Sequence, residues 1–266
     1  MTPNFRPSLR ILFILFFQVL VPLALQGSDV YWINSSGGNW SNGANWSSGT
    51  VPGAGNTVVI NAAGSYTVNL NANVAIANLT LHAGAGNRPP LNTSAYTITI
   101  SGGNVTVAQD ATLALGGVLT GGNLNLLSGG NLNWSAGTLG ANTTIYIGAK
   151  VYISGTGTKV SNNLLTCGGN ITHMGTGSLR MDSGSSLFIA SGGLYDIQDT
   201  GDLAYNNGGN VIVQGTLRKS LNSGTSYVGQ PLDNLGGTVE VKSGTLQVSR
   251  GGRDHEGSWN ASAGTT

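Results

Sequence analysis

Residues 208–217, GGNVIVQGTL, contain the repeated unit that decides the fold of this chain. Variants of its first six residues begin at five other places: GGNVTV at Gly102, GGNLNL at Gly121, GGNLNW at Gly129, GGNITH at Gly168 and GGTVEV at Gly236. Glycine adopts positive φ without a steric clash and asparagine tolerates the left-handed region, so each copy begins with a turn. The two apolar residues that follow, one position apart, point to the same side of a strand. Each copy therefore predicts a turn and a very short strand with one buried face.

The spacing of the copies predicts how the strands are arranged. The intervals between successive copies are sums of two lengths. About eight residues separate one short strand from the next, and about twenty residues bring the chain back to the same position of the repeat. Three short strands and three turns fit into about 20 to 24 residues, which predicts a three-sided coil stacked on the next with parallel strands about 4.8 Å apart. We predict an all-β, right-handed parallel β-helix, a β-solenoid whose hand follows that of parallel crossovers. The glycine pairs are expected on one phase of the coil.

The composition agrees with a stacked repeat. Only 8% of the residues are charged and 43 are glycine. A disordered chain of this polarity would lack the alternating apolar runs and would carry more charge. A β-sandwich or an up-and-down barrel expects longer strands joined by hairpin turns such as Asn-Gly, which occurs only at Asn42 and Asn207. No segment after residue 27 has apolar residues at helical spacing, which excludes a helix-rich fold.

Residues 1–27 differ in kind from the rest and are predicted to be a secretory signal peptide. Arg6 and Arg10 precede residues 11–25, an apolar run interrupted only by Gln18 and Pro22. The alternative is an uncleaved membrane anchor, although the run is shorter than the ~20 residues that span a bilayer. Removal of residues 1–27 removes two of the 11 basic residues and none of the 10 acidic ones, which leaves a net charge near −1. We therefore expect a secreted or cell-surface location, no multi-pass membrane protein and no binding to nucleic acid through bulk charge.

Residues 28–95 are predicted to form an aromatic N-terminal cap and the first coils. Trp32, Trp40 and Trp46 alternate with glycine and asparagine ahead of the first regular strands. A solenoid must cover the open end of its apolar core, and three indoles in one region could do so. The alternative is a carbohydrate-binding platform, because indole faces stack well on the apolar faces of sugars.

The same opening resembles that of secreted and surface-attached bacterial parallel β-helix proteins of the adhesin and autotransporter-passenger kind. The resemblance covers about fifty residues and rests on Trp32, Gly38, Trp40, Asn45, Trp46, Gly49, Pro52, Gly55, Val58, Ile60, Tyr66 and Val68. Such openings commonly carry aspartate where this chain has Asn56. The resemblance implies export and a surface or extracellular role, and it carries over no catalytic residue.

Residues 96–266 are predicted to be β-helix repeats. Residues 82–94, which include Arg88-Pro89-Pro90, are expected to protrude as a loop because prolines cannot donate to a sheet ladder. Residues 219–234 are expected to form a second loop. The last repeat, residues 257–266, stops where another strand is expected, so we expect a chain truncated at its C-terminus, the N-terminal part of a longer surface protein. An uncapped solenoid end of this kind is expected to self-associate.

An acidic group on one flank is the best candidate for a site. The interval from Asp182 to Asp202 is close to the expected length of one coil, and so are the two intervals that separate Arg180, Asp199 and Lys219, so each set would stack in a column. Stacked carboxylates repel each other unless a cation lies between them, and calcium is the candidate metal outside the cell. Polysaccharide lyases of this fold use carboxylate-bound calcium. The alternatives are a calcium site at Asp182, Asp199 and Asp202 or a solvated charge ladder.

Two single residues are interpreted as structural. His173 takes an inward position of its repeat, where we expect it at the edge of the core with a bond to a backbone carbonyl. Cys167 has no cysteine partner and is expected to be buried. No catalytic residue is assigned and no organic cofactor is expected. The sequence favours a non-catalytic structural or adhesive β-solenoid whose partner is a polysaccharide or a host surface, and the alternative is a polysaccharide-binding or polysaccharide-cleaving β-helix.

Overall fold

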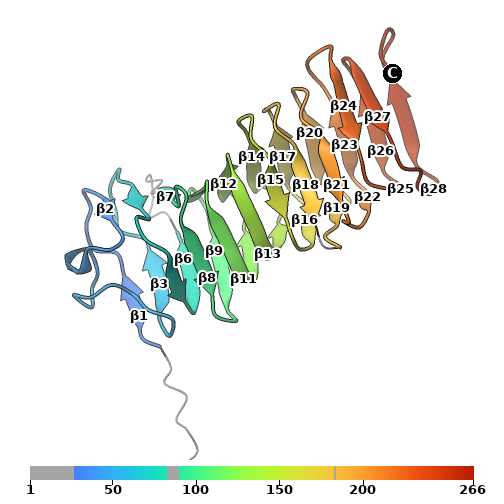
Figure 1. Ribbon diagram of the computed structural model, residues 1–266. Coiled ribbons are helices and arrows are strands. Elements are labelled where there is room, and N and C mark those ends of the chain that lie inside the picture. Colours follow the sequence, from blue (N-terminus) through green and yellow to red (C-terminus); the bar gives the residue numbers. More distant parts are fainter. Residues whose placement is uncertain (1–26, 83–89, 183) are drawn as a thin grey trace, which may run out of the picture.

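The computed structural model describes residues 27–82, 90–182 and 184–266. Within them the chain winds into a parallel β-solenoid of about nine turns, with coils stacked in sequence order along one axis (Figure 1). The predicted signal peptide lies almost entirely in residues 1–26, outside the described residues. The described part contains one helical element, the 3-10 turn η1 (Gly43–Asn45), and thus no helix that is long and apolar enough to cross a membrane.

Each coil has three sides, which we call faces 1, 2 and 3 in chain order, so the predicted three-sided coil is confirmed. Face 1 contains β5 (Val74–Ile76), β8 (Thr97–Ile100), the first parts of β11 (Val118–Leu126) and β13 (Gly137–Ile145), β15 (Lys159–Ser161), β18 (Leu179–Asp182), β21 (Leu203–Asn206), β24 (Thr225–Val228) and β27 (Thr245–Val248). Face 2 contains β1 (Asp29–Tyr31), β3 (Thr57–Ile60), β6 (Asn78–Leu81), β9 (Asn104–Val107), the second parts of β11 and β13, β16 (Leu165–Cys167), β19 (Leu187–Ile189), β22 (Val211–Val213), β25 (Leu232–Leu235) and β28 (Asp254–His255).

Face 3 is a separate sheet of eleven strands. It contains β2 (Gly38–Asn39), β4 (Val68–Asn69), β7 (Pro90–Asn92), β10 (Thr112–Leu115), β12 (Asn131–Trp134), β14 (Lys150–Ile153), β17 (Asn170–His173), β20 (Leu194–Ile197), β23 (Thr216–Lys219), β26 (Thr238–Val241) and β29 (Ser258–Ala261). Faces 1 and 2 form one 18-stranded sheet, because β11 and β13 bend from face 1 into face 2 without a break. Seven residue pairs join β11 to β13.

Each repeated unit forms a turn and a short strand as predicted, but the units do not all lie at the same corner of the coil. The two alternating residues of each copy point inward, for example Leu124 and Leu126 or Val211 and Val213, and in the copy at Gly168 the second of them is His173. The copies at Gly102, Gly121 and Gly208 lead into face 2, whereas those at Gly129, Gly168 and Gly236 lead into face 3. The expectation of a single phase is therefore wrong. Both corners need the same residue type, because a Cβ at Gly103 would strike Ala77 O and one at Gly130 would strike Val107 O of the preceding coil.

Both predicted loops contain strands. Pro90 begins β7 on face 3, where the missing N–H of a first strand residue is tolerated. Residues 83–89 of that loop lie outside the described residues. Residues 219–234 hold β24 and most of β25, whose Ser226, Val228 and Leu232 are buried. The many polar residues of this segment made its short runs of alternating inward residues hard to recognise in the sequence.

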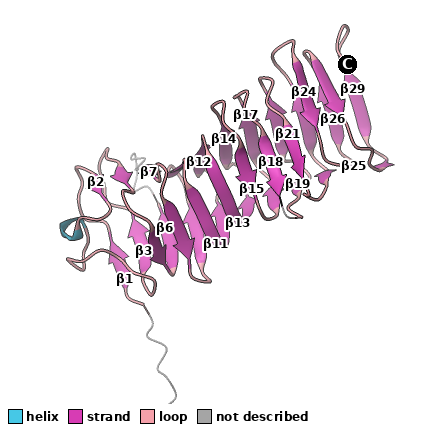
Figure 2. Ribbon diagram, viewed as in Figure 1, coloured by secondary structure: helices cyan, strands magenta, loops and turns pink. Residues whose placement is uncertain are grey.

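The N-terminal end of the core is filled by an aromatic cluster, Trp32, Trp40, Trp46 and Tyr66. Trp46 directly follows η1, which Figure 2 shows at the N-terminal end of the stack. The rings of Trp32 and Trp46 are 4.9 Å apart and those of Trp40 and Trp46 are 4.7 Å apart, both edge to face. Trp32 Nε1 donates to Asn34 O at 2.7 Å, and Trp46 Nε1 donates to Trp40 O at 2.8 Å. The predicted aromatic cap is thus a packed and hydrogen-bonded cluster.

Candidate functional site

The three tryptophans of the aromatic cluster offer no ring face to a sugar. Trp32, Trp40 and Trp46 are each no more than 1% exposed, packed against one another and against the first coils. A stacking platform needs an open ring face. The structure therefore supports the cap interpretation of these residues and removes the geometric basis of the carbohydrate-binding interpretation.

The predicted acidic columns do not form, because the coils in this region are longer than the intervals that separate these residues in the sequence. β18 and β21 pair with Leu179 beside Leu203, so Asp182 lies beside Asn206 and Arg180 beside Ala204. Lys219 pairs with Ile197. The expected stacking of Asp182 on Asp202, and of Arg180, Asp199 and Lys219 in one column, is therefore wrong.

Each of the three carboxylates proposed for calcium has partners within the protein. Asp182 receives two hydrogen bonds of 2.8 Å from Arg180, which hold its pKa below the ordinary value. Asp199 Oδ1 accepts from Thr200 N at 2.8 Å and from Asn222 Nδ2 at 2.9 Å, and Asp202 Oδ1 accepts from Tyr227 N at 2.8 Å. Among the described residues no group of three or more His, Cys, Asp or Glu side chains is placed to hold a metal ion.

Ion pairs instead connect neighbouring coils on faces 2 and 3. Arg218 of β23 lies beside Asp196 of β20 and donates to both carboxylate oxygens, at 3.1 and 2.9 Å. Burial raises the pKa of Asp196, but bonds from Arg218 and Gln198 outweigh burial and hold the pKa below its ordinary value. On face 2 the buried Asp233 accepts from Arg253 at 2.8 Å, which lowers its pKa to about 2. Each of these ion pairs joins side chains of two neighbouring coils.

Three buried polar side chains inside the core are the most unusual feature of the second half. Lys159, His173 and Lys219 are fully buried at inward positions. Each lies beside a turn that joins face 3 to face 1, and each bonds a carbonyl of such a turn. Lys159 Nζ donates to Gly155 O at 3.2 Å, and Lys219 Nζ donates to Asp199 O at 2.9 Å and Leu221 O at 3.3 Å. We call these three side chains the internal polar seam.

His173 is neutral within the seam. Nε2 lies 2.8 Å from Gly177 O, which can only accept, so Nε2 carries the proton. Nδ1 then accepts from the Tyr195 hydroxyl at 3.0 Å. Burial, with a smaller contribution from the positive charge of Lys159, lowers the pKa of His173 to about 4. The expected bond from His173 to a backbone carbonyl is confirmed, as is the burial of Cys167.

The sequence reasoning did not place the other two members of the seam in the core: Lys159 was not singled out, and Lys219 was expected in a charged column with Arg180 and Asp199. Lys159 and Lys219 both occupy inward positions of the alternating pattern, where an apolar residue is expected. Their inward positions could have indicated buried side chains, because a basic residue at such a position must bond acceptors inside the coil.

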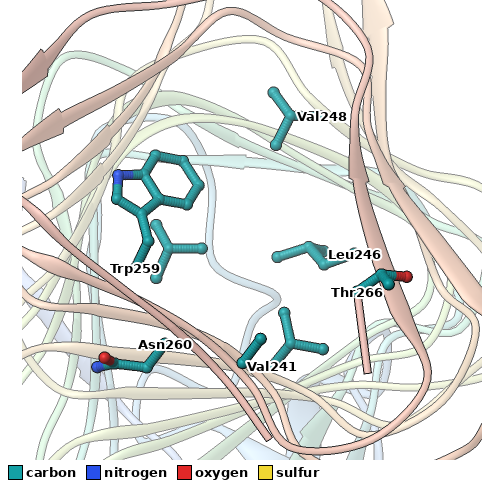
Figure 3. Close-up of a pocket in the computed structure, with 8 residues that line it drawn as sticks. Val241, Leu246, Val248, Trp259, Asn260 and Thr266 are labelled. Carbon is teal, nitrogen blue, oxygen red and sulfur yellow. The ribbon is translucent and has the colours of Figure 1, made fainter. Parts of the chain in front are cut away.

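The end of the core opposite the aromatic cluster is open. A groove of about 170 Å³ lies there, lined by Val239, Val241, Leu246, Val248, Trp259, Asn260, Ala261 and Thr266. Figure 3 shows the Trp259 ring and the side chains of Val241, Leu246 and Val248 arranged around an empty centre. Trp259 is 49% exposed, with its Nε1 donating to Asp254 at 3.1 Å. The groove is an apolar surface that can accept further β-structure.

Comparisons with protein-family models, with curated proteins and with solved structures gave no match to this chain. Its interpretation therefore rests on the sequence pattern and on the geometry of its own residues.

Proposed function

We propose that this protein is a non-catalytic structural or adhesive β-solenoid that acts outside the cell, secreted or held at a bacterial surface. The observation that carries the proposal is the unbroken ladder of face 3, in which eleven parallel strands follow one another. Ten steps of about 4.8 Å give a rod about 50 Å long. Bending the rod would strain backbone hydrogen bonds on all three faces, so the coil acts as a stiff spacer.

Export is supported by residues 1–27, where two arginines precede an apolar run. It is also supported by the resemblance of the Trp, Gly and Pro opening to surface-attached bacterial β-helix proteins. The weakly charged outer faces of the first coils, rich in Asn and Thr, suit a protein that works in an aqueous exterior without recruiting polyelectrolytes.

Fractionation of bacteria that produce the full chain tests this proposal. The chain carries a C-terminal tag, and a matched variant lacks residues 1–27. We expect the full chain in the medium or on the envelope, where protease added to intact cells removes it, while the shortened variant stays inside. A full chain that stays inside the cells together with the shortened variant would overturn the proposal.

We also propose that the open groove at β26, β27 and β29 associates with a second copy of the chain. Apolar side chains line it, and the aromatic cluster closes the opposite end of the core, so like ends are the ones that can meet. Sedimentation at increasing concentration should show a dimer that Trp259→Lys abolishes. Tyr227→Lys is the control, because Tyr227 is similarly exposed (44%) but lies on face 1. A monomer at all concentrations, or a dimer unaffected by Trp259→Lys, contradicts this assignment.

A further inference from the structure

Face 2 carries two rows of short polar side chains on its outer surface over four successive coils. β6, β9, β11 and β13 pair in register there, so equivalent residues of neighbouring coils lie side by side. The first row consists of Asn78, Asn104, Asn123 and Asn142, and the second row consists of Thr80, Thr106, Asn125 and Thr144. We call these eight side chains the polar array.

The backbone sets the spacing of the polar array in two directions. Neighbouring coils place the residues of one row about 4.8 Å apart. The two rows are separated by two residues along each strand, which corresponds to about 6.6 Å. The first row contains only asparagine, and the second contains threonine in all coils but one, so the side chains within a row are similar in length. The polar array is therefore a regular grid of even height.

Hydrogen bonds hold the first row in place. Asn123 Nδ2 donates to Asn104 Oδ1 at 3.0 Å, and Asn78 Oδ1 accepts from the backbone N–H of Asn104 at 2.9 Å. Asn78 Nδ2 donates to Thr57 Oγ1 of the preceding coil at 3.3 Å. Side chains that are already fixed lose little conformational entropy when they bind a ligand. The first row is thus preorganised for binding.

The second row has free hydrogen-bonding groups. The side chains of Thr80, Thr106, Asn125 and Thr144 alternate with the inward leucine, valine and isoleucine residues of their strands and point outward. Within the described part of the chain, none of the four side chains has a hydrogen-bond partner. Each of them can donate and accept, so the row offers both kinds of group to a ligand once per coil.

The regularity of the polar array is specific to face 2. β6, β9, β11 and β13 contain no charged residue. On face 3 the corresponding rows change length and charge from one coil to the next, because Lys150 lies beside Asn131 and Tyr152 lies beside Asn133. A composition rich in asparagine and threonine therefore does not by itself produce a grid, whereas the register of face 2 does.

We propose that the polar array binds ice. Hexagonal ice repeats its water molecules at spacings close to both spacings of the array, and hydroxyl and amide groups can take the place of water in such a lattice. A protein partner would need apolar area, and a sugar would need a groove or an open aromatic ring. The outward side chains of the array offer neither. This activity goes beyond the proposed rod function and does not depend on where the protein is located.

Thermal hysteresis of the purified full chain tests the proposal. A single ice crystal is held in the protein solution just below its melting point, and its growth is followed by microscopy during cooling. We expect a gap between melting and growth that widens with protein concentration, whereas serum albumin at the same concentration gives none. Because the test uses purified protein, its failure leaves the export result untouched, and the reverse is also true.

Matched variants assign the activity to the polar array. Thr106→Lys should remove most of the thermal hysteresis, because a long charged side chain interrupts the grid at its centre. Thr144→Lys is a second variant in another coil, and urea unfolding shows that each variant is folded. Thr172→Lys is the control, since Thr172 is a half-buried outward threonine on face 3. No hysteresis with the unmodified chain, hysteresis that both array variants leave unchanged, or an equal loss with Thr172→Lys overturns the proposal.

Discussion

The two halves of the solenoid solve the same packing problem with different residues. Residues 97–153 contain two charged side chains, whereas residues 159–248 contain eleven. One inner column of face 3 shows the contrast along its length. It reads Leu115, Trp134, Ile153, His173, Ile197, Lys219 and Val241 in successive coils. The first half of this column is apolar, and the second half alternates apolar and basic residues.

The turns explain the difference. Between faces 3 and 1 the first half uses two residues, 116–117 or 135–136, whereas the second half uses five, as in 154–158, 174–178 and 198–202. A five-residue turn directs carbonyls such as Gly155 O and Gly177 O toward the interior, where an unpaired carbonyl is unfavourable. Lys159 and His173 supply the missing donors. Buried basic residues in this solenoid are thus a consequence of longer turns.

The largest effect is expected in the first half. Trp134→Ala should lower the free energy of unfolding by about 3–5 kcal/mol, because it leaves a large cavity between Leu115 and Ile153. Trp134→Phe should cost less than about 1.5 kcal/mol, since it keeps most of the ring and removes an Nε1 that has no partner in the described part of the chain. Urea unfolding followed by circular dichroism measures both variants. Equal losses would show that ring volume is not what stabilises this half.

The internal polar seam should make the second half sensitive to mild acid. The pKa of His173 falls from 6.5 in the unfolded chain to about 4 in the folded one, so its contribution is complete above pH 6.5 and is lost as the pH falls toward 4. The loss should be about 3 kcal/mol. His173→Gln removes the titration and keeps a donor for Gly177 O. Unfolding free energies of the two proteins measured from pH 7.5 to 4 should converge. Parallel curves would contradict a buried neutral His173.

Other groups facing His173 do not share this pH window. The Tyr195 hydroxyl has its pKa raised well above the ordinary value by burial, and burial lowers that of Lys159. Asp233, far from the seam, has a pKa of about 2, so its contribution is present above 3.8 and is lost only below that pH. The change between pH 6.5 and 4 is therefore assigned to His173.

The ion pairs of the second half should have an intermediate effect. Arg218→Ala leaves the Asp196 carboxylate, which is only 4% exposed, without its main partner, and we expect a loss of about 2 kcal/mol. Lys242→Ala is the matched control, because its pair with Glu240 is longer, at 3.4 Å, and more exposed, so the loss should stay below about 0.5 kcal/mol. Thermal unfolding of both variants at two salt concentrations measures the difference. Similar losses would mean that burial of Asp196 does not matter.

The smallest effect is expected on the outer surface of the first half. Asn123 Nδ2 donates to Asn104 Oδ1 of the preceding coil at 3.0 Å, in solvent. Urea unfolding of Asn123→Ala should show a loss of about 0.5 kcal/mol. Asn142→Ala is the control, since Asn142 is exposed in the next coil and its amide has no partner among the described residues. A loss at Asn123 as large as that expected for the buried Arg218 pair would show that the first half depends on its surface ladder as well as on its core.

The fold could be predicted from the sequence because the inward pattern is local. Two apolar residues around one variable residue, after a glycine pair, mark a strand without knowledge of its neighbours. The site could not be predicted in the same way. Which residue of one coil lies beside which residue of the next depends on the exact length of every turn. The coil here is slightly longer than the interval from Asp182 to Asp202, so Asn206, and not Asp202, lies beside Asp182.

The internal polar seam had only a weak signal in the sequence. Lys159 occupies a position where the alternating pattern predicts an apolar residue, and the residue beside it in the next coil, Leu179, is apolar. A lysine in that position reads as a strand end unless the five-residue turn beside it is recognised. Chemistry distributed over several coils is visible only once that register is known.

The continuous bend of β11 and β13 has a mechanical consequence. In a stacked array, unravelling that begins at one end advances by losing one interface at a time. Where two coils pair through separate short strands, the strand pairs of the three faces can break one after another. β11 and β13 cross a corner as single strands and pair on both sides of it, so faces 1 and 2 must separate together there. A pulling force applied at β29 should therefore peel the later coils and then stall at this pair, leaving the aromatic end folded as the last block to resist the force.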